Sequence, residues 1–393
     1  MNVPKLRFKE FNDKWKPINL ANTFQYFSTN SFSREQLSES GILKNLHYGD
    51  IHRKYNSIVN ENKDITSYIK DINYVNKYEL LKNNDLIFAD ASEDYEGIGK
   101  AVEVVNVNNN TVSGLHTILA RDNSNVFAPM FKGYYFNSPI VHKQVRVLAN
   151  GFKVYGISRD SINKLNIRIP SIQEQSKIAN TLYLLDKKIE LQTKKIEDLK
   201  LFKLYMENQF IFKDDASYTE YKLRDILIEG NKTPIADTSK YQKLTIKLNL
   251  KGLEFNESQK EMSDKRPFYV RDENELIIGK QNYFNGSIAI VDKKYAGGIC
   301  SNAIMSFKAK DGFDIKYIYL YLSQKSYMKQ REFLANGTGQ KELSEKEFLN
   351  FSIRIPSDNK VKKIIKNVNC ISKKILLEKN KLNKKIKRQN LMD

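Results

Sequence analysis

The chain has 393 residues, of which 40% are hydrophobic and 28% charged, and its formal net charge is +19. This length suits two or three domains, each large enough to bury a core, and the composition excludes a mainly disordered protein. No apolar run reaches the roughly 18 residues of a membrane helix, and the N-terminus lacks the apolar stretch of a signal peptide, so we expect a cytoplasmic protein.

Residues 1–170 have the pattern of an α+β globular domain. Short β-branched and aromatic runs, such as DLIFA at 85–89 and KAVEVVNV at 100–107, are separated by Gly, Asn and Asp. Such runs predict strands, and the residues between them predict turns. The last run is the unusual string IRIPS at 167–171.

A long helix is predicted over 171–212, because residues 172–210 contain neither Pro nor Gly. Ser171 and Glu174 have the spacing of a capping box at its start, just after Pro170. Apolar side chains recur along the helix at alternating steps of four and three, the heptad period of a coiled coil. We call this stripe the heptad seam, and polar Gln192 and Lys203 interrupt it. Its apolar members are Ile178, Leu182, Leu185, Ile189, Ile196, Leu199 and Met206.

A second α+β domain is predicted over 213–356, with strands at 275–279, 287–292 and 303–309 and an amphipathic helix at 313–334. The string IRIPS returns at 353–357, and residues 357–393 form a second heptad helix. Its seam consists of Ile364, Val368, Ile371, Ile375 and Leu382.

Most of the positive charge lies in this last helix. Residues 360–388 hold twelve Lys or Arg and one acid, Glu378, a local charge of +11. Such a face suits solvent, a DNA backbone or an acidic partner equally well. The globular parts are only mildly basic, so nucleic acid bound there would be held by individually placed side chains.

The chain is a duplication. The two IRIPS strings, the two LANG strings at 148–151 and 334–337, and Ser158 with Ser344 are all separated by 186 residues. A narrow apolar stripe needs a partner helix, and we expect the two seams to pack as an antiparallel coiled coil in a pseudo-twofold arrangement. About 35 helical residues span roughly 50 Å, the length of about 15 base pairs.

No catalytic constellation is evident. The GIGK string at 97–100 lacks the spacing of a phosphate-binding loop and predicts a turn, and NSPI at 137–140 lacks the second proline and the aromatic residue of an amino-methyltransferase string. His47, His52, His116 and His142 form no HExxH pair and have no neighbouring Cys ligands. The acid and lysine pairs at 275–280 are common in so charged a chain, and Cys300 and Cys370 suggest neither a disulfide framework nor a metal site.

Four strings carry a resemblance to a known family: PKLRFKEF at 4–11, HYGDIH at 47–52, DLIFADAS at 85–92 and IRIPSIQEQSKIA at 167–179. Together with the duplicated plan, they resemble the specificity (S) subunit of type I restriction-modification enzymes over nearly the whole chain. One departure is that the second copy reads IRIPSDNKVKKI, without the EQ of the first. The resemblance therefore implies docking surfaces that are unequal at the two helix starts.

The resemblance implies a non-catalytic, sequence-specific DNA-binding subunit. Residues 1–170 and 213–356 would be target recognition domains, each reading half of a bipartite double-stranded DNA target, with IRIPS the hinge between each domain and its helix. The helices at 171–212 and 357–393 would be conserved spacers that set the gap and dock two methyltransferase subunits, and through them two restriction subunits. The chain would carry no cofactor of its own, since S-adenosylmethionine, ATP and magnesium are expected on the partner subunits.

Base reading requires Arg, Lys, Asn, Gln and similar side chains on exposed loops. The first-domain candidates are Asn30, Ser31, Arg34, Tyr48, His52, Lys54, Ser92 and Lys153. The second-domain candidates are Lys280, Gln281, Asn282, Tyr283, Thr338, Gln340 and Lys341. Each of these side chains also suits an ordinary solvated loop. For Asp50 we expect a turn cap around Gly49, with Ile51 in the core.

Two other function classes remain open on the sequence alone. One is a nuclease or DNA methyltransferase fragment with its own active site, which would act on DNA without a partner. The other is a coiled-coil scaffold that binds proteins and no DNA.

Overall fold

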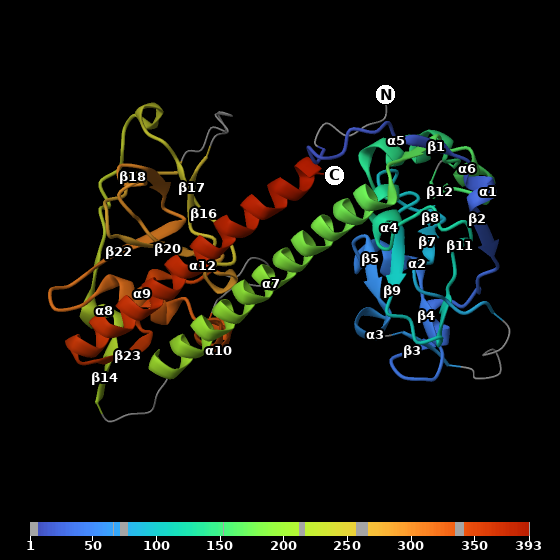
Figure 1. Ribbon diagram of the computed structural model, residues 1–393. Helices are drawn as coiled ribbons and strands as arrows, with labels where there is room; N and C mark the ends of the chain where they lie inside the picture. Colours follow the sequence, from blue (N-terminus) through green and yellow to red (C-terminus); the bar gives the residue numbers. More distant parts are fainter. Residues whose placement is uncertain are drawn as a thin grey trace. The chain divides into compact units, whose positions relative to one another are not determined.

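In the computed structural model, the chain forms two compact units, residues 1–194 with 379–393, and residues 195–378. The structure describes residues 7–65, 67–70, 78–151, 153–211, 217–256, 266–334 and 342–392. Each unit contains one α+β domain and parts of two long helices, α7 (Ile172–Ile211) and α12 (Asp358–Met392), as Figure 1 shows. No described helix is long and apolar enough to span a membrane.

The first domain is built on a five-stranded sheet of order β2-β11-β7-β9-β5, antiparallel except for the parallel β5–β9 pair. The predicted strands at 85–89 and 100–107 are β7 and β9, the central strands of this sheet. Their side chains are buried on both faces, which explains their continuous apolar runs. The strands are β2 (Phe24–Phe27), β11 (Thr117–Asp122), β7 (Leu86–Ala89), β9 (Ala101–Val105) and β5 (Ile58–Asn60).

In the described part of the first domain, three smaller sheets and six short helices accompany this sheet. A four-stranded sheet has the order β10 (Thr111–Ser113), β4 (Lys44–Leu46), β6 (Tyr68–Ile69) and β3 (Leu37–Ser38). Two-stranded sheets pair β1 (Lys16–Ile18) with β13 (Ile167–Ile169) and β12 (Tyr155–Gly156) with β8 (Ala91–Ser92). The helices are α1 (Leu20–Thr23), α2 (Tyr48–Arg53), α3 (Glu61–Asp64), α4 (Phe131–Phe136), α5 (Pro139–Leu148) and α6 (Arg159–Asn163), with the 3₁₀ turn η1 (Arg34–Gln36).

Two of the weak catalytic strings have structural roles in this domain. GIGK lies in the turn between β8 and β9, as predicted. In NSPI, Asn137 and Ser138 join α4 to α5, and Pro139 is the first residue of α5. The Asn137 side chain binds the backbone of Ala101 in β9, so this string ties the helices to the central sheet.

The second domain repeats the frame around a smaller main sheet. Its four-stranded sheet has the order β15 (Leu227–Glu229), β22 (Ile304–Ala309), β19 (Leu276–Gly279) and β20 (Ile288–Ile290), the last three being the predicted strands. Pairs form between β14 (Tyr218–Lys222) and β23 (Ser352–Pro356), β16 (Leu244–Ile246) and β17 (Leu253–Phe255), and β18 (Phe268–Val270) and β21 (Ile299–Ser301). The helices are α8 (Leu223–Ile226), α9 (Ile315–Leu322), α10 (Lys325–Arg331) and α11 (Glu345–Leu349), with the 3₁₀ turns η3 (Thr238–Lys240), η4 (Tyr283–Asn285) and η5 (Glu332–Leu334).

The single helix predicted over 313–334 is wrong, because the segment divides into α9, α10 and η5. The break falls at Ser323 and Gln324, whose side chains both donate hydrogen bonds to the carbonyl of Leu320. These bonds satisfy a carbonyl at the end of α9, so the helix stops there. Of the two free cysteines, Cys300 is buried and Cys370 exposed.

Each IRIPS string connects a domain to its long helix, as predicted. The string supplies β13 before α7 and β23 before α12, and the first turns of each helix join the core of the preceding domain. Ser171 accepts a hydrogen bond from the Glu174 amide, as in a capping box. The second half of the box is not formed, because the Glu174 carboxylate instead binds the guanidinium of Arg7 at 2.6 and 2.7 Å.

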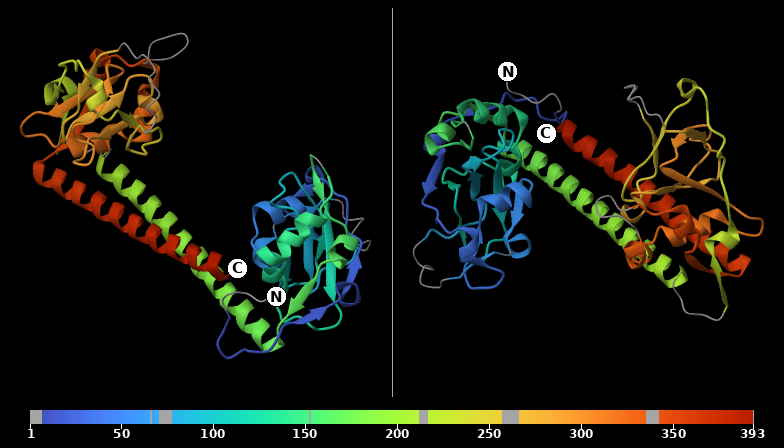
Figure 2. Two further views of the ribbon diagram at one scale, coloured as in Figure 1. Left: turned by 90° about the horizontal axis from the view of Figure 1, so that it is seen from above. Right: turned by 180° about the vertical axis from the view of Figure 1, so that it is seen from behind.

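The heptad seam is the stripe of both long helices that is shielded from solvent. All its predicted members are buried or half-buried, including polar Gln192. In the first unit, Lys385 binds Gln192 at 2.9 Å and Gln389 binds Asp186 at 2.6 Å, so residue numbers rise along α7 as they fall along α12. Both views of Figure 2 show these two segments side by side. The predicted antiparallel packing is confirmed there, and in the second unit Lys195 pairs with buried Glu378 at 3.3 Å.

Candidate nucleic-acid interface

The start of α2 in the first domain is fixed by a histidine. His47 is the N-cap residue, and its Nδ1 accepts a hydrogen bond from the amide of Gly49. Burial, reinforced by the nearby Arg34 guanidinium, lowers the pKa of His47, which favours the neutral ring that can accept this bond. Ile51 lies in the core, as predicted. The cap expected from Asp50 is wrong, because His47 supplies it.

Asp50 is instead the buried centre of an ion-pair group. Its carboxylate is 2% exposed and lies 3.0 Å from Arg34 Nη2 and 3.2 Å from Lys54 Nζ. The two cations are about half exposed. Asp50 therefore holds two of the predicted DNA-contacting side chains in place at the surface. Ordering a long cationic side chain costs conformational entropy, and the ion pairs with Asp50 offset that cost.

Aromatic rings gather around Tyr48 beside this group, and we call His47, Tyr48, His52 and His116 the Tyr48 cluster. The Tyr48 ring lies edge-on to His52 and His116, with centroids 6.2 and 5.2 Å away. His52 Nε2 bonds the carbonyl of Ala91 at 3.0 Å, and His116 Nδ1 lies 3.3 Å from Asp90. Burial raises the pKa of the Asp90 carboxyl, and His116 opposes this. His47 is buried, Tyr48 and His52 are partly buried and His116 is 50% exposed, so the cluster presents three rings to solvent beside the two cations.

The first-domain candidates divide by exposure. Arg34, Tyr48, His52 and Lys54 come together at or beside the Tyr48 cluster, and Ser31 and Lys153 are exposed elsewhere. Asn30 is 3% exposed, and its amide donates to Asn45 and to the carbonyl of Ser113. Ser92 is 7% exposed and bonds the backbone of Asp94. Both side chains are buried and hydrogen-bonded within the domain, so Asn30 and Ser92 are not available to contact bases.

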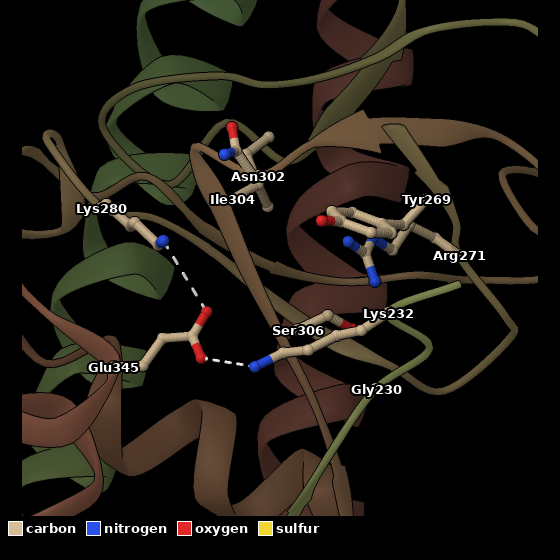
Figure 3. Close-up of a pocket in the computed structure, with 9 residues that line it drawn as sticks. All are labelled: Gly230, Lys232, Tyr269, Arg271, Lys280, Asn302, Ile304, Ser306 and Glu345. Atoms are coloured by element: carbon tan, nitrogen blue, oxygen red, sulfur yellow. Dashed lines mark hydrogen bonds and ion pairs between the residues drawn. The ribbon is translucent and has the colours of Figure 1, made fainter. Parts of the chain in front are cut away.

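In the second domain, the loop after β19 lies beside a cavity of about 200 Å³, which we call the Arg271 pocket. Glu345 pairs there with Lys232 at 2.8 Å and with Lys280 at 3.7 Å, while the guanidinium of Arg271 lies against the ring of Tyr269 (Figure 3). Arg271 Nε is buried without a hydrogen-bond partner. The lining residues are Gly230, Lys232, Tyr269, Arg271, Lys280, Asn302, Ile304, Ser306 and Glu345.

The second-domain candidates divide in the same way. Lys280 lines the pocket, and Gln281 and Asn282 are exposed on the loop that follows it. Tyr283 is fully buried, and its hydroxyl donates to the carbonyl of Leu322 at 2.9 Å. It is therefore a core residue rather than a base reader. Thr338, Gln340 and Lys341 lie outside the described residues.

Two segments of the chain match one protein family. Residues 12–201 and 216–388 each match the family model described as the type I restriction modification DNA specificity domain. The chain belongs to that family. It is a specificity subunit with two copies of the domain, and the two matched segments each contain one α+β domain and most of the long helix that follows.

Known specificity subunits are similar to this one in sequence and fold. It is 25% identical over 339 residues to the putative type I restriction enzyme MjaX specificity subunit of Methanocaldococcus jannaschii, covering 78% of this chain and 77% of that one. Its fold matches the type I restriction-modification S subunit from M. genitalium with a TM-score of 0.60 and 14% identity, over 99% and 97% of the two chains. A chain from a study of complex assembly and conformational transition of the type I R-M system matches with a TM-score of 0.55 and 12% identity, over 98% and 97%.

Several residues of these two sites were not predicted from the sequence of this specificity subunit. Asp90 and His116 join Tyr48 in the first domain, and Lys232 and Arg271 line the pocket in the second. Asp90 lies inside the DLIFADAS string, which offered a signal, whereas His116 was weighed only as a metal ligand. In the part of the chain that the structure describes, no three His, Cys, Asp or Glu side chains are placed to share a metal ion.

Proposed function

We propose that this specificity subunit is the DNA-reading, non-catalytic component of a type I restriction-modification enzyme in the cytoplasm. Each domain reads one half of a bipartite DNA target, and the long helices set the gap and dock two methyltransferase subunits. Two restriction subunits join through these. S-adenosylmethionine, ATP and magnesium belong to the partner subunits in this proposal.

The observation that carries the proposal is the combination of two DNA specificity domains with different exposed polar surfaces. The first domain presents the Tyr48 cluster with Arg34 and Lys54, whose rings and cations suit base edges and phosphates. The second presents Lys280, Gln281 and Asn282 beside the Arg271 pocket. Different surfaces on a repeated frame are what reading two different half-sites requires.

The proposal that the helices dock partner subunits is supported by apolar side chains outside the heptad seam. Large apolar residues exposed on helices favour burial against another protein. On α7 these are Ile172, Leu184, Leu191, Leu201, Phe202, Leu204 and Tyr205, and on α12 they are Leu376, Leu377 and Ile386. Their exposed fractions range from 38% for Ile386 to 66% for Leu191 and Leu201.

Domain exchange tests the reading function. Residues 1–170 are replaced by the first recognition domain of another specificity subunit, and methylated sites are mapped in cells that express the methyltransferase subunit. One half-site should change while the other half and the gap stay the same. The matched control exchanges residues 213–356 and should change the opposite half. A change in both halves from either exchange would contradict the proposal.

A heptad insertion tests the role of the helices. One heptad is inserted into α7 between Ile189 and Ile196, and one into α12 between Ile375 and Leu382, so that the seam stays in register. Seven residues add about 10 Å, which should lengthen the gap by about three base pairs with both half-sites intact. Altered half-site letters with an unchanged gap would refute this role.

A third experiment separates the proposal from the enzyme alternative. The purified chain alone is incubated with plasmid DNA and either S-adenosylmethionine or magnesium. We expect neither methyl transfer nor cleavage until the methyltransferase subunit is added, which restores methylation at the bipartite target. Activity of the chain alone would assign it an active site of its own.

A further inference from the structure

His116 has an unusual backbone for an exposed residue. Its φ is 53°, in the left-handed region, and its side chain is 50% exposed on the turn that enters β11. A residue with a Cβ is strained in this region, although His tolerates it better than most. Such a conformation persists where the surrounding structure holds it, and it concentrates at functional sites. Here the hydrogen bond from the Asp90 amide to the His116 carbonyl, at 3.0 Å, holds the turn.

The imidazole of His116 contacts both Asp90 and Tyr48. Nδ1 lies 3.3 Å from the Asp90 carboxylate, and the Tyr48 ring meets the imidazole edge-on at a centroid distance of 5.2 Å. A carboxylate accepts the Nδ1 proton whether the ring is neutral or charged, so Asp90 fixes which nitrogen faces inward. The other nitrogen, Nε2, makes no hydrogen bond within the described part of the chain.

The second domain has the same frame with different side chains. There the amide of Lys280 donates to the carbonyl of Ala303 at 3.0 Å, matching the bond between Asp90 and His116. The registers agree too, because Ala89 pairs with Thr117 in the first domain and Gly279 with Ile304 in the second. An acid and a histidine therefore occupy the positions of a lysine and an alanine. A requirement of the frame would apply to both copies, so the difference belongs to what each domain recognises.

We infer that His116 is a specificity-determining residue of the first domain: its Nε2 hydrogen-bonds a base edge in the major groove of the first half-site, and Asp90 is its positioning residue. This inference rests on the proposed function. A half-exposed ring with one nitrogen fixed inward presents a single directed hydrogen-bonding group, which suits a base edge. A phosphate contact would carry no sequence information, and that is the alternative outcome of the test.

The experiment uses the complex with methyltransferase subunits and a DNA library with each base pair of the first half-site varied in turn. His116→Asn keeps a residue that accepts the left-handed backbone but replaces the imidazole. We expect discrimination at one base pair to fall about tenfold or to move to another base, with preferences at all other positions unchanged. Asn109→Ala is the matched control, since Asn109 is exposed with a φ of 57° on another turn of the same domain. It should leave every preference unchanged.

Asp90 variants test the positioning role and provide a second route should one variant fold poorly. Asp90→Asn retains an oxygen that accepts from Nδ1 and should preserve the preference, whereas Asp90→Leu should weaken it at the same base pair that His116→Asn affects. A uniform loss at all sequences, or no change in any preference, would overturn the inference and leave a structural or phosphate-contacting role. If the unmodified complex methylates no bipartite target, the proposed function fails instead, so the two failures are distinguishable.

Discussion

The heptad seam predicts that two apolar side chains on α7 differ sharply in their contribution to stability. Ile196 lies in the seam and is 4% exposed, whereas Leu201, five residues later in the same unit, is 66% exposed. Truncation to Ala removes three carbons from either. At about 0.8 kcal/mol per buried carbon, Ile196→Ala loses about 2.4 kcal/mol of transfer free energy. The cavity that remains adds to this cost, and the better helix propensity of Ala subtracts from it. The net loss of stability should be about 2 to 4 kcal/mol.

Leu201→Ala should cost about 0.5 kcal/mol, because only about a third of that side chain is withdrawn from water. The free energy of unfolding is measured by urea denaturation followed by far-UV circular dichroism, with the denaturant slope checked for constancy. Leu201→Ala should instead weaken assembly with methyltransferase subunits, measured by titration of the purified components. Equal destabilisation by the two variants would refute the assignment of the seam, and equal assembly would refute the docking role of Leu201.

Three further predictions concern pH, a long-range ion pair and the basic helix. Burial lowers the pKa of His47 in the folded state, so near the ordinary histidine pKa of 6.5 the unfolded chain binds more protons than the folded chain. The free energy of unfolding should therefore fall as the pH drops below about 6.5. His47→Asn keeps a capping side chain and should flatten the dependence of the urea midpoint on pH between pH 7 and 5. Arg7→Ala strands the Glu174 carboxylate, which is 1% exposed, and should cost about 2 kcal/mol in thermal unfolding, whereas Arg7→Ala with Glu174→Gln should cost less. Lys384, Lys387 and Arg388 are exposed, and replacing them by Gln should weaken the salt dependence of DNA binding by the complex. The slope of log K against log salt concentration should fall by about 0.9 for each phosphate that is no longer neutralised. An unchanged slope would assign these side chains to partner docking or solubility.

Patterns that repeat within a few residues were predictable from the sequence. The seam emerged from its 3-4 period, and the central strands from continuous apolar runs such as residues 86–89. Both signals arise because one stripe or strand is buried along its whole length, so neighbouring residues report the same environment. The connection from each domain to its long helix was predictable because the duplicated IRIPS string occurs at the same place in both copies.

Features set by distant partners were not predictable. The partners of Asn30 include the Ser113 carbonyl, 83 residues away, and Glu174 binds Arg7, 167 residues away. No local pattern distinguishes such a buried amide from a solvated loop residue. The left-handed turn at His116 is likewise fixed by its bond to Asp90, which only the folded sheet brings within reach.

The two helix starts show how one duplicated frame acquires unequal surfaces. In the first domain, Gln175 accepts a hydrogen bond from the Ala128 amide at 2.9 Å and donates to the carbonyls of Val126 and Pro170, so α7 is tied to its domain by polar bonds. At the matching position of α12, Val361 packs into the core with Phe313 and Tyr317 beside a cavity of about 260 Å³. Hydrogen bonds fix direction, whereas apolar contacts are non-directional, so Gln175 constrains the orientation of its helix start more than Val361 does. The missing EQ in the second copy thus changes how the helix is anchored as well as the surface it presents, and any partner that recognises both helix starts meets two different sets of side chains.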